Sequence, residues 1–191
     1  MWIEESVKMH CKGRVYLCRY ADDFVCAFEL ESDAQRYYKV LPKRLAKFGL
    51  EVAPEKTCII QFDRKSKKRF DFLGFEFYWG KGRSGYRVLK RRTSRKKYNA
   101  ALVGFKAWCQ KHGHLPKALL FSKLNRKLRG YWNYYGIRGN YESIVDYYYR
   151  IKGILFKWLN RRSQKRSYNW TGFKALLKDF PLIKPHICHG F

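Results

Sequence analysis

Two adjacent acids, Asp22 and Asp23, stand in the segment RYADDF between stretches that are otherwise apolar. Carboxylates are hard oxygen ligands of the kind that Mg²⁺ and other divalent ions prefer. A tight turn is the other explanation, because Asp side chains form hydrogen bonds with the local backbone of turns. The pair is therefore a candidate metal site or a plain turn, and the surrounding elements bear on the choice.

The residues on both sides of the acids predict two strands. Residues 13–29 alternate and are rich in Val, Tyr, Phe and Cys, with ADD between GRVYLCRY and FVCAFE. Ser32 and Gln35 then have the spacing of a helix capping box, and apolar residues follow at helical spacing until Gly49. We therefore expect a hairpin with acids at its tip, followed by a helix.

Farther along, residues 57–62 (TCIIQF) predict a third strand, and residues 70–79 (FDFLGFEFYW) predict one more strand or a hairpin. Gly74 lies inside the second segment, where a glycine usually marks a bulge or the close approach of another backbone. From about residue 90, four amphipathic helical patterns follow. The expected fold class is α+β, with an antiparallel sheet and one helix in residues 1–85 and a basic all-α domain in residues 86–191.

The charge of the chain is strongly positive and unevenly spread. Its formal value is +27, from 42 Lys and Arg against 15 Asp and Glu. Residues 1–76 hold 12 acidic and 15 basic side chains, whereas residues 77–191 hold 3 acidic and 27 basic. A solvated face or a membrane-surface patch could carry such charge, but the aromatics interleaved with it favour nucleic acid, through phosphate contacts and base stacking.

Cysteine spacing and hydropathy bear on the compartment. The six cysteines include no Cys-x-x-Cys pair, and nothing resembles a secretory segment. We therefore expect reduced thiols in a cytoplasmic protein. No apolar run approaches the roughly 18 residues that a bilayer span needs, so no membrane partner is expected.

Three motifs occur in the order found in a known family. RYADDF resembles the Tyr-x-Asp-Asp motif of reverse transcriptases, FGLEVAPEKT resembles the segment that follows it in group II intron enzymes, and FDFLGFEF resembles their primer grip. LNRKLRGYWNYYG is similar to the thumb or maturase-specific domain of the intron-encoded proteins. Over about residues 13–191 the chain thus resembles the group II intron reverse transcriptase/maturase family.

The resemblance implies an RNA-directed DNA polymerase, a nucleotidyltransferase that also binds intron RNA and assists its splicing. Residues 1–85 would be half of the polymerase palm, and residues 86–191 the thumb or maturase domain. Expected partners are intron RNA, the template–primer duplex and DNA.

For the acids, the resemblance implies a two-metal Mg²⁺ site. Asp22 would be the direct metal ligand and Asp23 would support the site. Tyr20 would pack near the primer end or the incoming nucleotide. An isolated Asp pair without the flanking motifs would instead favour an ordinary turn.

Three further residues acquire expected roles from the resemblance. Lys56 would donate a proton to the pyrophosphate leaving group or balance its charge, although a Lys beside a strand is often only solvated. Leu73 and Gly74 would let the backbone lie against the primer strand, although the same segment also suits a core strand.

Two basic clusters are expected to contact nucleic acid. The first, which would contact phosphates, consists of Lys90, Arg91, Arg92, Arg95, Lys96 and Lys97. The second lies beside the aromatic run YWNYY, a mixture that suits irregular RNA, and consists of Asn125, Arg126 and Arg129. Such runs are often only solvated faces, and helical spacing places some of the aromatics in a core.

The metal site is expected to be incomplete in this chain. A polymerase palm also contributes an Asp from an earlier strand, and fingers supply basic residues, but only about 19 residues precede the motif. We therefore expect the C-terminal part of a reverse transcriptase, inactive alone and partnered by an upstream palm and fingers segment. A non-catalytic RNA-binding maturase fragment and a gene remnant are the alternatives.

Overall fold

The computed structural model describes residues 2–161 and 168–190. The chain divides into two compact units. The first unit comprises Met1–Leu73 with Phe77–Leu89, and the second comprises Gly74–Glu76 with Lys90–Phe191. Strands and helices occur in both parts of the sequence, so the α+β class predicted from the sequence is confirmed. The domain boundary predicted after residue 85 stays a prediction.

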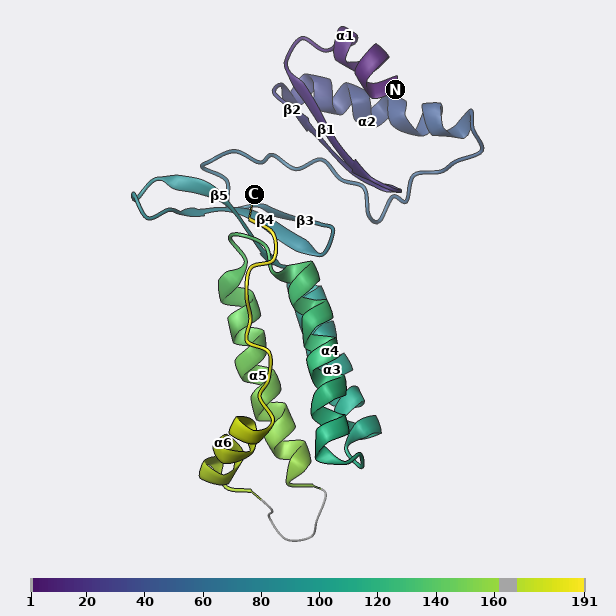
Figure 1. Cartoon of the computed structure of the whole chain (residues 1–191). Coiled ribbons are helices and arrows are strands. Elements are labelled where there is room, and N and C mark those ends of the chain that lie inside the picture. The colour runs from purple at the N-terminus through teal and green to yellow at the C-terminus, as the bar shows by residue number, and fades with distance from the viewer. Residues whose placement is uncertain (1, 162–167, 191) are drawn as a thin grey trace. The chain divides into compact units, whose positions relative to one another are not determined.

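The first unit is built on a β-hairpin and a helix, which Figure 1 shows in purple and blue. The two strands are antiparallel, and their register runs from the pair Val15↔Phe28 to the pair Tyr20↔Asp23. The predicted hairpin is therefore confirmed. In chain order the elements are η1 (Ile3–Val7), α1 (Lys8–His10), β1 (Val15–Tyr20), β2 (Asp23–Phe28) and α2 (Glu31–Ala46).

The helix α2 packs through an apolar face, as its spacing predicted. Tyr37 and Leu41 are buried, and the ring of Tyr37 lies 5.2 Å from that of Phe28. The predicted capping box is wrong, because the helix begins at Glu31 and no side chain caps it. The buried carboxylate of Asp33 instead accepts two backbone N–H bonds from the segment before β1. An acid in the first turn also suits the positive end of the helix dipole.

The predicted strand at residues 57–62 is wrong. Residues 57–62 form no strand, and neither of the two sheets found in the described part of the chain includes them. Phe62 packs instead against Phe70 and Trp79, with ring centroids 4.9 and 5.8 Å away. Phe62 therefore belongs to an aromatic cluster and not to a paired strand, and Cys58 and Ile59 are exposed.

A second sheet has the strand order β3-β4-β5. The strands are β3 (Arg69–Phe72), β4 (Phe75–Lys81) and β5 (Arg87–Thr93). Residues 70–79 thus form a hairpin, one of the two predicted outcomes. The strand β5 was not predicted, because its four basic residues hide the apolar alternation, and it carries Lys90, Arg91 and Arg92, which were expected at the start of the helical domain.

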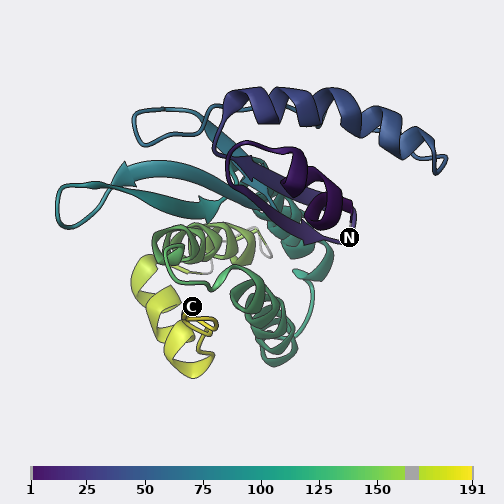
Figure 2. The same ribbon diagram turned by 90° about the horizontal axis from the view of Figure 1, so that it is seen from above.

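The second unit contains the four helices that the apolar spacing predicted. They are α3 (Arg95–His112), α4 (Lys117–Tyr135), α5 (Tyr141–Leu159) and α6 (Trp170–Asp179). Their buried side chains form one core, in which α6 lies against α5 in both views (Figures 1 and 2). The polar side chains of Ser94 and Asn169 cap α3 and α6 by accepting backbone N–H bonds.

A buried polar joint fixes the junction between β5 and the helices. The Asn140 side chain is 1% exposed and accepts a hydrogen bond of 2.7 Å from the backbone N–H of Thr93. Its amide nitrogen donates to the Thr93 hydroxyl and to the backbone carbonyl of Tyr135. One side chain therefore holds the end of β5 and the end of α4 at the start of α5.

Among the residues that the structure describes, no helix is both long and apolar enough to cross a bilayer.

Candidate functional site

The two acids lie at the tip of the β1–β2 hairpin. Tyr20 and Asp23 are the last paired residues, so the connection consists of Ala21 and Asp22 alone. Ala21 has a positive φ of 50°, and its carbonyl accepts a hydrogen bond of 2.8 Å from the Arg19 side chain. Both carboxylates are exposed. The turn therefore presents two adjacent acids to solvent.

The register places Tyr20 and Asp23 on the same face of the hairpin, since directly opposite residues share a face. The other face carries Val15 with Phe28, and α2 packs on it through the ring of Tyr37. The face with Tyr20 is not covered in this way, and the Tyr20 side chain is 68% exposed. An aromatic ring and a carboxylate thus share an open surface next to the tip.

The hairpin suits Mg²⁺ by the type of its donor atoms but not by their number. Exposed carboxylates are suitable oxygen ligands, and a magnesium ion keeps several waters. Within residues 2–161 and 168–190, no group of three or more His, Cys, Asp or Glu side chains could hold a metal ion. Asp22 and Asp23 could therefore supply part of a metal site.

Lys56 lies on a surface turn and makes its contacts there. Its side chain is exposed, and its backbone N–H donates to the carbonyl of Ala53 within a short turn. No hydrogen bond or ion pair in the described part of the chain joins its amine to Asp22 or Asp23. The structure thus gives Lys56 a position on a surface turn, and its role at a leaving group stays a prediction.

The Leu73–Gly74 turn joins β3 to β4 and has an unusual backbone. Both residues have positive φ, 49° and 77°, as a two-residue hairpin turn of the primed type requires. The Gly74 carbonyl accepts a 2.9 Å hydrogen bond from the backbone N–H of Ser94, the residue that caps α3. The turn is thereby fastened to the start of α3.

Around Gly74 the second unit brings together residues that are distant in sequence. A Cβ at Gly74 would lie 3.2 Å from the Tyr135 hydroxyl and 3.7 Å from carbons of Lys97 and Tyr134. The ring of Tyr134 lies nearly parallel to that of Phe75, with centroids 6.1 Å apart. Gly74 and Lys97, which were predicted separately, therefore belong to one cluster with Tyr134, an aromatic residue of the run YWNYY that was expected beside the second basic cluster.

Substitution of Gly74 by alanine should lower the free energy of unfolding by about 1–2 kcal/mol, because an L side chain is strained at positive φ. The added methyl would also press on the Tyr135 hydroxyl. Urea unfolding of the whole chain measures the change. Gly104→Ala is the matched control, since nothing lies within 4 Å of that position in α3 and alanine there should stabilise the helix. Equal effects of both substitutions would contradict the strain at Gly74.

The first basic cluster is split between two elements. Arg92 forms an ion pair of 2.6 Å with Glu76, and Arg91 donates to the carbonyl of Arg138 at 3.0 Å. Lys90 is exposed on β5, and the side chains of Arg95, Lys96 and Lys97 are exposed in the first turn of α3. Three cations at a helix N-terminus oppose the helix dipole. A polyanion bound there would offset this repulsion.

The three residues of the second cluster, Asn125, Arg126 and Arg129, have different surroundings in the fold. Asn125 donates to the carbonyl of Pro181 at 2.8 Å and accepts from the N–H of Ile183 at 2.9 Å. Its amide group therefore holds the segment after α6 along α4. Arg126 and Arg129 are exposed on the same helix and are open to a partner.

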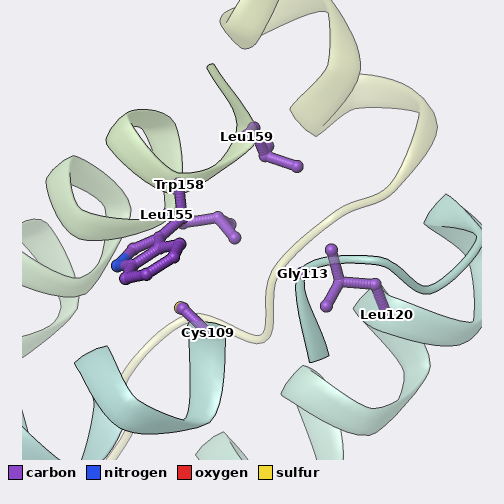
Figure 3. A pocket seen from close by; sticks show the side chains of 6 residues that line it. All are labelled: Cys109, Gly113, Leu120, Leu155, Trp158 and Leu159. Atoms are coloured by element: carbon purple, nitrogen blue, oxygen red, sulfur yellow. The ribbon is translucent and has the colours of Figure 1, made fainter. Parts of the chain in front are cut away.

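A small hollow in the helical core is not a substrate site. It measures about 10 Å³ for the centre of a water-sized sphere, about the least that holds one water. Its lining is apolar (Figure 3), and the residues are Cys109, Gly113, Leu120, Leu155, Trp158 and Leu159. Burial raises the pKa of the Cys109 thiol to about 12, which keeps it neutral and unreactive at physiological pH.

Comparison with known proteins identifies the class to which the first part of the chain is similar. Residues 2–77 match the model of the family described as reverse transcriptase (RNA-dependent DNA polymerase). The matched segment includes the β1–β2 hairpin with Asp22 and Asp23, and it ends within β4. No curated protein matches the chain. At the level of the family, the match supports RNA-directed DNA polymerase, with nucleic acid partners and divalent metal ions in general.

Proposed function

We propose that the chain is part of an RNA-directed DNA polymerase of a group II intron type element, with a maturase role in binding and splicing intron RNA. The observation that carries the proposal is the two-residue turn at Ala21 and Asp22. It sets two carboxylates beside the open face of Tyr20, inside the segment that matches reverse transcriptases. The intron class rests on the resemblance of the motifs and of the basic helical region.

The chemistry of nucleotide addition fits the residues at the tip. Two Mg²⁺ ions, when bound, would provide positive charge that activates the primer hydroxyl and holds the triphosphate. Asp22 would hold such an ion and Asp23 would support the site. The exposed Tyr20 ring would pack on the primer end or the incoming nucleotide. Lys56 would balance the charge of the leaving pyrophosphate.

The second unit would hold the nucleic acid. The Leu73–Gly74 turn would lie against the primer backbone, with Lys97 beside it for a phosphate. The exposed cations of β5 and α3 would bind the duplex or intron RNA. We further propose that catalysis needs another metal-binding carboxylate and basic residues for the nucleotide, supplied by an upstream palm and fingers segment.

Primer extension on an RNA template with Mg²⁺ tests this function. The chain alone should extend no primer, whereas the chain fused to a fingers and palm segment of a group II intron enzyme should. Asp22→Asn should abolish extension by the fusion, because the amide is a poor metal ligand. The matched control is Asp179→Asn at the exposed end of α6, which should leave extension unchanged.

Two results would contradict these proposals. Extension by the fusion that persists in Asp22→Asn would overturn the catalytic role of the hairpin. Extension by the chain alone that disappears in Asp22→Asn would overturn the need for another segment.

A second candidate function is an RNA-binding maturase module that uses no carboxylates. The charge of the helical region favours it, since residues 77–191 hold 27 basic and 3 acidic side chains. Such a module would keep RNA binding and splicing after both tip acids are removed.

A further inference from the structure

Exposed aromatic side chains follow α5 and the start of α6, outside the surfaces assigned above. Tyr141 and Tyr149 on α5 are 51% and 64% exposed, and Trp170 at the start of α6 is 53% exposed. Large aromatic side chains usually bury most of their surface in a fold. Three exposed aromatic side chains in the second unit therefore indicate a surface that binds a partner.

Helical spacing places these residues of α5 on one stripe. Residues that are three, four, seven or eight positions apart share a face of a helix. These intervals separate Tyr141 from Tyr148 and Tyr149, those two from Lys152, and Lys152 from Phe156. The core residues of the helix, among them Tyr147 and Ile151, occupy a neighbouring face. From Tyr141 to Phe156 the stripe is about 22 Å long at the rise of an α-helix.

A cation lies within this stripe. The Lys152 ammonium is 5.4 Å from the ring centroid of Tyr148 and 5.5 Å from that of Tyr149. The two rings themselves lie 5.8 Å apart at a steep angle. Cation–π contacts of this kind hold the ammonium next to the ring faces. A base stacked on Tyr149 would therefore have a positive charge beside its phosphate.

Trp170 forms the far end of the stripe and is rigidly held. Its ring stacks on Phe156 with centroids 4.2 Å apart and planes 12° from parallel. Phe156 is buried, and the Asn169 side chain caps α6 by accepting a 2.7 Å bond from the N–H of Gly172. The indole is therefore fixed on a packed ring while half of its surface stays exposed.

Charge decides which partner suits this surface. Residues 90–191 hold 24 basic and 3 acidic side chains. Two of these acids lie on α5 near the stripe: Glu142 is exposed in the first turn beside Tyr141, and Asp146 is bound by Arg150 at 3.0 Å and by the Tyr98 hydroxyl. Exposed aromatics in a positive field are the mixture that binds unpaired bases by stacking and their backbone by charge.

We propose that the exposed rings of Tyr141, Tyr149 and Trp170 form, with Lys152, a stacking platform for a single-stranded segment of RNA, while the half-buried Tyr148 packs against the core and helps hold the Lys152 ammonium. The proposal deepens the nucleic-acid binding proposed above and rests on it. It assigns the stripe to unpaired bases, separately from the duplex contacts of β5 and α3. Because stacking uses only the face of a base, binding should be tolerant of sequence and should accept a DNA strand as well.

Binding of the whole chain to a labelled 12-nucleotide single strand and to duplex RNA of the same length tests the platform. Tyr149→Ala should weaken single-strand binding about tenfold and leave duplex binding within twofold. Tyr149→Phe should restore it, because the ring is kept. Since Tyr149 is largely exposed, its truncation should not disturb the fold, and Trp170→Ala should act in the same direction.

Salt dependence separates stacking from charge. Tyr149→Ala should leave the slope of log K against log salt unchanged, whereas Lys152→Gln should reduce it by about 0.7 for a single strand. Tyr86→Ala is the matched control, since Tyr86 is 77% exposed and lies outside the stripe. It should bind like the unmodified chain.

The possible outcomes are distinct. If the unmodified chain binds RNA while Tyr149→Ala and Trp170→Ala bind single strands equally well, the platform is overturned and the proposed function stands. Equal losses of affinity for the single strand and for the duplex would also overturn the platform. If the unmodified chain binds no RNA, the proposed function fails together with the platform. If Tyr149→Ala loses the same share of its affinity for single-stranded RNA and for single-stranded DNA, the result supports stacking on unpaired bases.

Discussion

Reversal of three charges at the start of α3 should lower the affinity for RNA at least about a hundredfold in moderate salt. The change is Arg95→Glu with Lys96→Glu and Lys97→Glu, all exposed side chains of the first turn. Each lost phosphate contact should reduce the slope of log K against log salt by about 0.7–0.9. Fluorescence anisotropy with a structured RNA at several salt concentrations measures both quantities.

This triple change has an unusual advantage for interpretation. Acids in the first turn of a helix interact favourably with its dipole, whereas the native cations do not. The variant should therefore unfold at the same urea concentration as the unmodified chain or at a higher one. Loss of RNA binding could then not be explained by loss of structure.

Two controls make the result specific. Lys39→Glu, Lys43→Glu and Lys47→Glu change the net charge by the same amount at exposed positions of the first unit. An equal loss of affinity there would mean that net charge alone governs binding and would contradict a site on α3. Asp22→Ala with Asp23→Ala should keep RNA affinity within twofold, because the proposed RNA contacts do not include the acids at the hairpin tip.

Substitution of Trp132 by alanine should lower the free energy of unfolding by about 3–5 kcal/mol, the range for large aromatic residues in a core. The side chain is 0% exposed, and its indole N–H donates to the carbonyl of Ile183 at 3.2 Å. Its ring lies 5.5 Å from that of Tyr131 and 6.2 Å from that of Tyr147. A small domain has about 5–15 kcal/mol in total, so the loss would be a large part of it.

Urea unfolding followed by far-ultraviolet circular dichroism measures this loss, since α3 to α6 contribute much of the helical signal. Trp132→Phe is the matched control, because it keeps a ring in the core and removes the hydrogen bond. Its effect should be less than half that of alanine. A loss below 1 kcal/mol for Trp132→Ala would contradict the central position of this residue.

Local patterns predicted much of the fold correctly. The hairpin around Asp22 follows from alternation over a few residues, and the four helices follow from apolar spacing within each segment. The strand predicted at residues 57–62 failed because pairing depends on a distant partner, which short-range alternation does not reveal. The strand β5 escaped prediction for the converse reason, since Arg91 and Arg92 conceal its pattern.

The candidate site was predicted less completely than the fold. The position of Asp22 and Asp23 at a tip could be predicted, because only neighbouring residues determine it. The meeting of Gly74 with Lys97 and Tyr134 could not, since it depends on how α3 and α4 pack. Asn125 was expected to contact RNA, yet its contacts with Pro181 and Ile183 depend on where the segment after α6 lies.

The length of the hairpin turn, more than its composition, controls where the acids lie. Side chains alternate between the two faces of a strand, so inserting or deleting one residue between Tyr20 and Asp23 would leave two outcomes. Either β2 would bulge at the tip, or the whole strand would exchange its faces and turn Phe28 away from α2. The packing of α2 at the opposite end of the hairpin therefore constrains the number of residues in the turn, a constraint separate from the one that the proposed chemistry places on Asp22.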